Sequence, residues 1–416
     1  MRLPRLLVKA TNVNYCMVSD LVSCFLFLLL FSLLPFFVTS GAHTFNLPLA
    51  EYSGLNSSNA AIFDCFHDLL QSTQRCTNSR LLYYERKGGG EYFGFGSEFN
   101  YHLSGALMLA VANKQRLVLV RDRSELAGYE CLDTQSWDCY LSFPCEDSVI
   151  DYEDVKNVNT ENRLANTYYS QVNNEHSVPS LTDVLRMRCK AGQYLRPGEN
   201  VSVPVVRAVE DIVIGHLFHL NAETEKKVEE FVKFTGLAGK QYLAVHIRAT
   251  DKAKELNDFA WGTLHNMNIL YNCIGGYLNV PVQLEYAFIS SDDCNLVDAL
   301  SKKFPKSTHI VSPCDIHSMK SEIISSHFRA VLNHADPRHG DERNNDKVSN
   351  YFRTLRLLGE LRVWTDAAQY FGLFQSNLGR LTYRLRALKH PLFRTHDILC
   401  RRTDHTRMDG HEANIY

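Results

Sequence analysis

A short apolar run that ends abruptly in charged residues constrains this chain most. Residues 242–245, Tyr-Leu-Ala-Val, are apolar and partly β-branched, which is typical of a buried strand in a parallel sheet. The ionisable residues His246, Arg248, Asp251 and Lys252 follow it directly. Because ligands bind outside the carboxyl ends of strands in open α/β sheets, we expect Arg248 and Lys252 to hold an anionic, phosphate-bearing ligand. The alternative is an internal ion pair between Arg248 and Asp251 that caps the next helix.

Length and charge limit the classes of protein to consider. The chain has 416 residues, more than one hydrophobic core usually serves, so two domains with additional segments are predicted. The formal net charge of −2 gives no signal for nucleic acid. Any anion site must therefore be local, and we expect no nucleic-acid partner.

The N-terminus predicts a membrane anchor. Positive charge in residues 1–20 precedes residues 21–38, which carry no charge and are close to the shortest length that spans a bilayer. By the positive-inside rule, residues 1–20 are a cytosolic tail, 21–38 a transmembrane signal anchor, and the remainder is lumenal. Small residues at 39–42 make a cleaved signal peptide the alternative.

The cysteines agree with a lumenal compartment. Ten of the 12 cysteines follow the predicted anchor: Cys65, Cys76, Cys131, Cys139, Cys145, Cys189, Cys273, Cys294, Cys314 and Cys400. An even number in an oxidising lumen predicts disulfides, although their pairing stays open. No two of these cysteines have the spacing of a zinc ligand pair, so we expect no structural metal.

The first half of the chain predicts one α/β domain. Residues 39–85 are polar and are predicted as a stem with one helix near 60–71. A Gly-rich turn then leads into an amphipathic helix over 103–112 and a buried strand over 116–120. This order is typical of a Rossmann-like unit, and we predict an N-terminal Rossmann-like domain over 86–235. The glycines lack the GxGxxG pattern, which disfavours a nicotinamide or flavin site.

The second half predicts another domain of the same class. Helices are predicted over 207–218, 222–234, 296–304, 355–368 and 380–388, and strands over 284–290, 309–311 and 371–374. Alternating strands and helices are typical of right-handed α/β repeats. We therefore predict a C-terminal Rossmann-like domain over 236–390, followed by a polar tail over 391–416.

Three turns that follow predicted strands carry the chemistry: 248–252, 290–293 and 375–379. In a doubly wound domain they neighbour one another at one edge of the sheet. The first supplies cations for a diphosphate, and the second supplies Asp292 and Asp293 for ribose hydroxyls or a base edge. The third supplies a hydroxyl and backbone N–H groups at a helix N-terminus. This set describes a sugar-nucleotide site that needs no metal. The alternative for the second turn is a helix N-cap and its solvated neighbour.

These residues resemble a known family. His246-Ile-Arg-Ala-Thr-Asp-Lys252 resembles the His-Val-Arg-Arg-Thr-Asp-Lys motif of the α-1,6-fucosyltransferase and bacterial nodulation fucosyltransferase family. The segments 94–120, 288–305 and 357–384 are similar to other parts of that family. The resemblance covers about 90–390 discontinuously and is most specific in 241–293.

The resemblance implies an α/β, GT-B-like fold in which two Rossmann-like domains face a cleft, with the N-terminal domain on the acceptor side. It implies an inverting, metal-independent transfer of L-fucose from GDP-fucose to a glycan or glycoprotein acceptor, with no cofactor besides the donor substrate. Together with the predicted anchor, it implies a single-pass type II protein of the Golgi membrane whose catalytic part is lumenal.

Roles for individual residues also follow from the resemblance. It places Arg248 on the β-phosphate, Lys252 in the proton relay with Asp251 nearby, and Asp292 or Asp293 on the nucleoside. His246 and Glu360 are assigned to the donor, Glu360 to its base or sugar. Ser376 is assigned to the phosphates, and Asn377, which replaces a Gln of the family motif, to the donor site. A core histidine is the alternative for His246.

The sequence departs from the family at several positions. Ala249 replaces the second Arg of the motif, and the family carboxylate falls on Leu256. Glu255, one residue earlier, is the candidate base, with Asp258 in reserve. These departures keep two alternatives open: a protein O-fucosyltransferase or other GDP-sugar transferase, and an inactive lumenal glycan-binding protein.

Overall fold

The computed structural model of the protein describes residues 57–85, 95–121, 131, 137–156, 163–165, 181–189, 201–248, 266–277, 285–314, 347–374, 376–389 and 394–398. The predicted cytosolic tail and anchor, residues 1–38, lie outside these ranges. Within the described part, no helix combines the length and the apolar character that crossing a bilayer requires.

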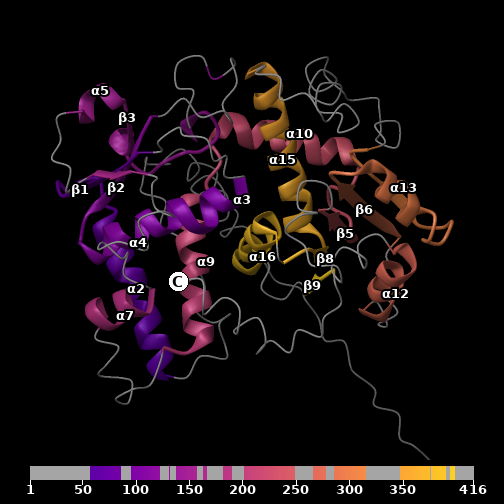
Figure 1. The fold of residues 1–416 in the computed structure, drawn as a ribbon, viewed down its shortest axis with the longest axis horizontal. Helices are drawn as coiled ribbons and strands as arrows, with labels where there is room; N and C mark the ends of the chain where they lie inside the picture. The colour runs from indigo at the N-terminus through magenta and orange to yellow at the C-terminus, as the bar shows by residue number, and fades with distance from the viewer. Residues whose placement is uncertain are drawn as a thin grey trace, which may run out of the picture. The chain divides into compact units, whose positions relative to one another are not determined.

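The second half of the chain forms a parallel sheet in the order β7-β6-β5-β8-β9 (Figure 1). Its strands are β5 (Tyr242–Ile247), β6 (Tyr286–Ser291), β7 (His309–Val311), β8 (Gln369–Gly372) and β9 (Arg394–Asp397). The chain begins at the central strand, moves outward to β7, then crosses over to β8 and β9. Numbered from β5, this is the doubly wound order of dinucleotide-binding domains, whose ligands bind where the order reverses, here between β5 and β8.

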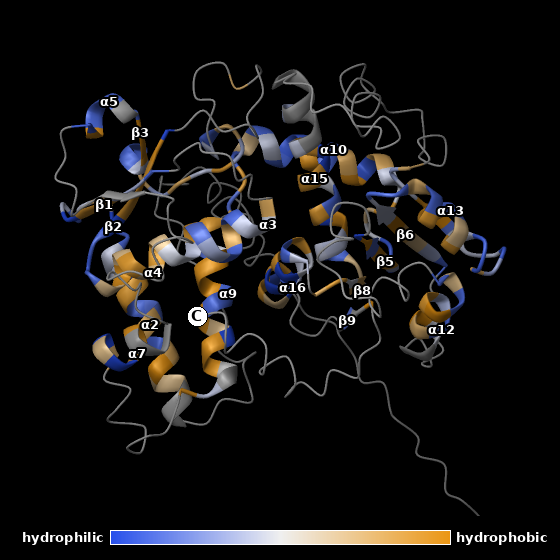
Figure 2. Cartoon of the chain, in the orientation of Figure 1, coloured by the Kyte–Doolittle hydropathy of each residue, from blue (hydrophilic) through white to orange (hydrophobic). Residues whose placement is uncertain are grey.

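Helices cover both faces of this sheet. They are α10 (Ala222–Thr235), α12 (Met267–Tyr277), α13 (Cys294–Ser301), α15 (Lys347–Asp366) and α16 (Asn377–Lys389). Leu243 and Val245 of β5 pack in one core with α12 and α13, whereas Ala244 belongs to the other core, with α15 and α16. Because strand side chains alternate, His246 faces the same side as Ala244. Along α10, α12 and α13, Figure 2 shows hydrophobic and hydrophilic residues in alternation.

The first half forms a second parallel sheet, in the order β3-β2-β1-β4. Its strands are β1 (Leu81–Glu85), β2 (Arg116–Val120), β3 (Val149–Ile150) and β4 (Arg163–Ala165). Its helices are α2 (Ser57–Thr73), α3 (Phe95–Ser97), the π-helix η3 (Glu98–Leu103), α4 (Ser104–Ala112), α5 (Tyr152–Val155), α7 (Leu181–Arg188) and α9 (Val203–Leu217), with 3-10 turns η4 (Trp137–Cys139) and η5 (Glu146–Ser148). The prediction of an α/β fold with two parallel sheets is therefore confirmed.

Two details of the first domain correct the sequence prediction. The segment 39–85, predicted as a stem, contains α2 and β1, and both belong to this domain. Ile62, Phe66 and Leu70 of α2 have no exposed surface, because they lie on the face of the helix that packs into the core. The predicted amphipathic helix over 103–112 is instead buried on nearly all sides as α4.

Disulfides tie distant segments together, as the cysteine count predicted. The pairs are Cys65–Cys189, Cys76–Cys145, Cys131–Cys139 and Cys294–Cys314, and Cys273 is also disulfide-bonded. The first pair joins α2 to the residue that follows α7, across 124 positions of the sequence. Such a cross-link stabilises the fold by restricting the unfolded chain.

The predicted elements of the second half are present, with shifts at their ends. The strand predicted to begin at 371 begins at Gln369, and α15 begins at Lys347 rather than near 355. Strand β9 lies in the segment 391–416, which had been predicted as a polar tail. It pairs with β8, so the second domain extends beyond the predicted end at 390.

Candidate functional site

His246 lies near the carboxyl end of β5 and has 4% of its surface exposed. Its ring stacks on the indole of Trp364 in α15, with the ring centroids 4.2 Å apart. Burial lowers the pKa of His246 to about 3; Arg248 lowers it too, and Asp292 acts in the opposite direction. His246 is therefore neutral at physiological pH and adds no positive charge to the site. Among the described residues, its Nδ1 atom has no hydrogen-bond partner.

Trp364 connects the ends of two neighbouring strands. While its ring packs on His246 of β5, its indole N–H donates to Ser290 Oγ of β6 at 2.9 Å. The residue is buried, with 1% of its surface exposed. Because one rigid side chain contacts both strand ends, it fixes the edge of the sheet where the predicted ligand would lie.

Arg248 follows β5 directly and forms an ion pair across that edge. Its Nε lies 3.5 Å from Asp292 Oδ2, at the end of β6, and the two side chains are 29% and 17% exposed. A partly exposed pair of this kind adds only about 0–1 kcal/mol to stability. The pair therefore does more to orient both groups than to hold the fold together. Asp251, the partner considered from the sequence, lies outside the described residues.

Asp293 has a structural role next to that pair. Its side chain accepts from the backbone N–H of Asn295 at 2.9 Å and caps α13, and its own N–H donates to Ser291 Oγ at 2.9 Å. This is the N-cap interpretation left open by the sequence. Of the two adjacent carboxylates, Asp292 is thus the better candidate for contact with a nucleoside.

The turn from β8 into α16 brings a helix N-terminus to the same edge. Strand β8 pairs with β5, so the start of α16 neighbours the end of β5. Ser376 is buried, and its N–H donates to the carbonyl of Leu373 at 2.9 Å. The turn is tight: a Cβ on Gly379 would lie 2.2 Å from that carbonyl oxygen. The partial positive charge of a helix N-terminus favours phosphate groups at this place.

Asn377, predicted to belong to the donor site, has partners in the first domain. Its side-chain amide donates to Ser97 Oγ, and its carbonyl accepts from Asn100 Nδ2 at 2.6 Å. A Cβ on Gly96 would lie 2.5 Å from the carbonyl carbon of Asn377, so this close approach requires glycine there. The sequence prediction missed Ser97 and Asn100. Gly96 was the available signal, because it belongs to the Gly-rich turn that precedes the predicted helix over 103–112.

Glu360 lies one helical turn before Trp364 on α15. It is buried and ion-paired with Arg356, whose Nε lies 2.7 Å from Glu360 Oε1. Burial raises the pKa of Glu360, and Arg356 acts against that shift. α15 runs antiparallel to the strands, from the carboxyl edge of the sheet back to the start of β8. Residues earlier in the helix therefore lie further toward the carboxyl edge, by about 1.5 Å per residue. Glu360 and Arg356 are thus further toward that edge than Trp364. A donor contact for Glu360 stays a prediction, and Arg356 joins the candidate residues.

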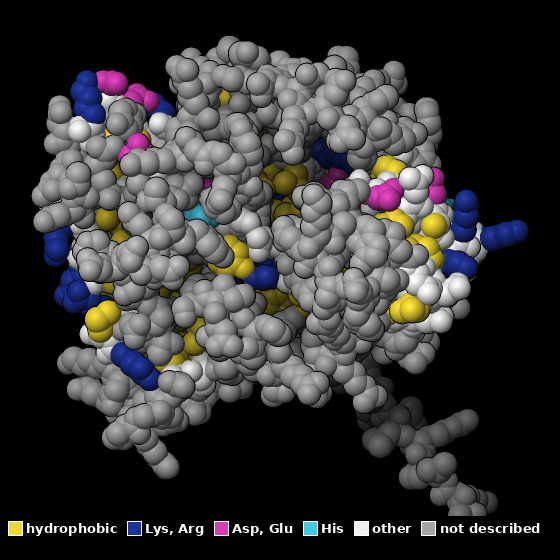
Figure 3. All heavy atoms as spheres, in the orientation of Figure 1, with side chains coloured by type: hydrophobic (Ala, Val, Ile, Leu, Met, Phe, Trp, Pro, Cys, Tyr) yellow, Lys and Arg dark blue, Asp and Glu magenta, His cyan; other side chains and the backbone are white. Residues whose placement is uncertain are grey.

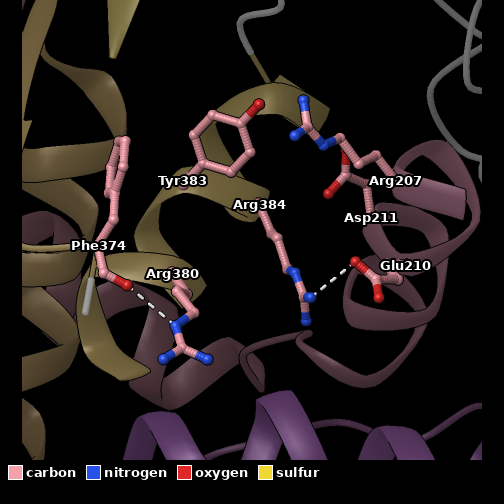
Figure 4. A pocket seen from close by; sticks show the side chains of 7 residues that line it. All are labelled: Arg207, Glu210, Asp211, Phe374, Arg380, Tyr383 and Arg384. Atoms are coloured by element: carbon pink, nitrogen blue, oxygen red, sulfur yellow. Dashed lines mark hydrogen bonds and ion pairs between the residues drawn. The ribbon is translucent and has the colours of Figure 1, made fainter. Parts of the chain in front are cut away.

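A small pocket opens between α9 and α16 (Figure 4). It is lined by Arg207, Glu210, Asp211, Phe374, Arg380, Tyr383 and Arg384. Its volume of about 30 Å³ holds roughly two water molecules and is far too small for a nucleotide. The pocket is therefore not the donor site. Its arginines instead connect α16 to the first domain.

The predicted proton-transfer residues lie outside the described part of the chain. They are Asp251, Lys252 and Glu255, with Asp258 in reserve, and their roles stay predictions. Among the residues that the structure describes, no three His, Cys, Asp or Glu side chains are grouped so as to hold a metal ion. On the face in Figure 3, both basic and acidic side chains of described residues are visible, most of them toward the outer edges of the view.

Comparisons with known proteins add the following. No family model matches the sequence, and no curated protein matches it. Among solved structures, the chain is similar to NodZ alpha-1,6-fucosyltransferase soaked with GDP-fucose, with 14% identity, coverage of 74% of this chain and 93% of that one, and a TM-score of 0.41. POFUT1 in complex with GDP is 10% identical, with 77% and 99% covered and a TM-score of 0.41.

A mutant of Arabidopsis thaliana FUT1 in complex with GDP is 12% identical, with 82% of this chain and 76% of that one covered and a TM-score of 0.41. NodZ is named as an alpha-1,6-fucosyltransferase, and the POFUT1 and FUT1 structures are complexes with GDP.

Proposed function

We propose that this protein is a glycosyltransferase that transfers L-fucose from GDP-fucose to a glycan acceptor, with inversion and without a metal ion. One observation carries the proposal. Arg248, Asp292 and the N-terminus of α16 follow the neighbouring strands β5, β6 and β8, at the point where the strand order reverses. This is the place at which doubly wound sheets bind nucleotides.

The described groups suit the two ends of a nucleoside diphosphate. A guanidinium offers several N–H donors in a fixed plane, which match phosphate oxygens, and Arg248 is 29% exposed. The α16 N-terminus adds backbone N–H donors and partial positive charge. Asp292, held beside Arg248, is the acceptor suited to ribose hydroxyls or a base edge. The neutral His246 and Trp364 are the buried residues next to Arg248 and Asp292.

The reaction needs a base and a counter-charge. The acceptor oxygen attacks the anomeric carbon of fucose as the bond between that carbon and the β-phosphate oxygen breaks. The acceptor proton passes to a carboxylate, for which Glu255 is the candidate, with Lys252 in the relay. GDP leaves carrying the electron pair of the broken bond, and Arg248 balances the negative charge that develops.

Nucleotide selectivity tests this proposal. GDP at about 100 times its dissociation constant adds about 2.7 kcal/mol to stability, whereas UDP at the same concentration leaves the melting temperature unchanged. Incubation with labelled GDP-fucose in the presence of EDTA is expected to release GDP and to transfer label to members of a glycan panel. The absence of stabilisation by GDP would contradict the proposal.

Adding folded protein acceptors and other GDP-sugars to this assay separates the alternatives left open by the sequence. Label transferred to folded protein substrates and not to glycans supports a protein O-fucosyltransferase. Glycan binding without GDP binding or turnover supports an inactive glycan-binding protein. Turnover of a GDP-sugar other than GDP-fucose identifies a different donor. An α-1,6 linkage is tested by sequencing the labelled glycan product.

We also propose a lumenal location in the Golgi, with residues 21–38 as the anchor of a type II membrane protein. The disulfides support an oxidising compartment, because such bonds are rare in the cytosol. Protease protection of intact Golgi vesicles tests this location. We expect the chain beyond residue 38 to be protected until detergent is added, and residues 1–20 to be accessible throughout.

A further inference from the structure

One face of α16 is directed at the first domain. Asn377, Arg380 and Arg384 are separated by three and then four residues, so they lie on the same side of the helix. In Figure 4, Arg380 and Arg384 extend from α16 in the same direction, with Arg384 reaching Glu210 of α9 at 2.7 Å. Arg380 donates to the hydroxyl of Tyr101 in η3 and to the carbonyl of Phe374 at 2.9 Å.

Asn100 stands at the centre of these contacts. It lies in the π-helix η3 and has 1% of its surface exposed. Its Nδ2 donates to the carbonyl of Asn377 at 2.6 Å, and its Oδ1 accepts from Arg384 Nη1 at 3.2 Å. Both ends of one buried amide are therefore used on α16, at the first turn and two turns later. π-helical turns are rare and are frequently found at functional sites.

The first turn of α16 is held at further points. The side-chain amide of Asn377 donates to Ser97 Oγ, next to Asn100 Nδ2 on the carbonyl of the same residue. Gly96 packs so closely on Asn377 that a Cβ there would lie 2.5 Å from its carbonyl carbon. The first domain thus fixes both the direction and the position of the helix N-terminus that faces the diphosphate.

We propose that Asn100 and Ser97 are positioning residues of the donor site: they hold the N-terminus of α16 in the orientation that binds a nucleoside diphosphate. This inference rests on the proposed function. Its consequence is that the first domain contributes to donor affinity as well as to acceptor contacts. Donor binding in turn restrains α3 and η3, because they are bonded to the turn that the phosphate engages.

Variants at Asn100 and at Ser97 test the two contacts separately. Asn100→Asp keeps the acceptor for Arg384 but removes the donor to Asn377, and is expected to weaken GDP binding about tenfold, as the loss of one buried hydrogen bond does. Ser97→Ala removes the acceptor for Asn377 and is expected to weaken GDP binding about threefold to tenfold. Ser97→Thr keeps a hydroxyl and is expected to bind GDP with wild-type affinity. Ser72→Ala is the control, since that hydroxyl bonds within its own helix to Leu69, and it leaves GDP affinity unchanged.

Hydrogen exchange on the unaltered protein gives a test that does not depend on the folding of any variant. With GDP bound, amides of residues 95–103 are expected to exchange more slowly, together with those of the first turn of α16. A merely structural role predicts slower exchange in α16 alone, and that result overturns the inference. Wild-type GDP affinity in folded Asn100→Asp and Ser97→Ala also overturns it, and leaves the proposed function intact. If the unaltered protein binds no GDP, the proposed function fails and this inference with it.

Discussion

The buried imidazole of His246 makes stability depend on pH in a way that one substitution isolates. Its pKa is lowered to about 3 from an ordinary value of 6.5, chiefly by burial and then by Arg248. Below pH 6.5 the unfolded chain therefore binds a proton that the folded protein does not bind. Stability decreases with falling pH wherever the unfolded state binds more protons, so His246 destabilises the fold progressively from pH 6.5 toward 3.

The size of the effect follows from the two pKa values. Between about pH 7 and pH 5, the free energy of unfolding is expected to fall by about 2 kcal/mol because of His246 alone. Most of that loss occurs below pH 6.5, where it approaches about 1.4 kcal/mol per pH unit. The other titrating groups also make the free energy of unfolding depend on pH. A variant that lacks only the imidazole of His246 keeps their contribution.

His246→Phe is that variant, because it keeps an aromatic ring against Trp364 but cannot bind a proton. Urea unfolding of both proteins at a series of pH values gives the difference directly. The loss between pH 7 and 5 is expected to be about 2 kcal/mol smaller in the variant. Ser72→Ala is the control: that hydroxyl does not titrate in this range and bonds within its own helix to Leu69, so the variant keeps the wild-type pH dependence. Parallel curves for wild type and His246→Phe would refute the burial of a neutral His246.

Two further predictions concern α15 and α16. Arg386 is buried and donates to three carbonyls at the end of α15: Trp364, Thr365 and Ala367. Arg386→Ala is expected to cost about 4 kcal/mol in urea unfolding by leaving them unpaired, with Arg386→Lys intermediate; a loss below about 1 kcal/mol contradicts this role. Gly379→Ala is expected to cost at least about 2 kcal/mol, because its Cβ meets Leu373. Gly275→Ala, in the open surroundings of α12, is expected to gain about 0.5–1 kcal/mol, and equal effects at both glycines would count against the close packing of the α16 start.

Elements with strong local signals were predictable. The apolar run at 242–245 became β5, and Asn221 caps α10 by accepting from the N–H of Thr224 at 2.8 Å. Strand β9 was missed because four mostly polar residues have no periodicity of their own, and only pairing with β8 makes them a strand. α2 was assigned to a stem because its flanks are polar, although its buried face joins the core.

Some features of the site could also be predicted from the sequence, and others could not. Which turns meet at the edge of the sheet follows from strand order, so the neighbourhood of Arg248 and Asp292 was predictable. Which of two adjacent carboxylates faces that edge depends on the geometry of the N-cap at Asp293, which spacing does not reveal. The contact between Asn100 and Asn377 spans 277 positions and two domains, and no local pattern encodes it.

The affinity of Arg248 variants for GDP and GMP, measured by titration calorimetry, tests the role of Arg248 most directly. Arg362→Ala is the matched control, since Arg362 pairs with Glu225 away from the site and its side chain is 24% exposed, close to the 29% of Arg248. We expect Arg248→Ala to weaken GDP binding about 10- to 100-fold, to leave GMP affinity within about twofold, and so to abolish the preference for the diphosphate. Unchanged GDP affinity in Arg248→Ala, or an equal loss in Arg362→Ala, would contradict the assignment of Arg248 to the β-phosphate.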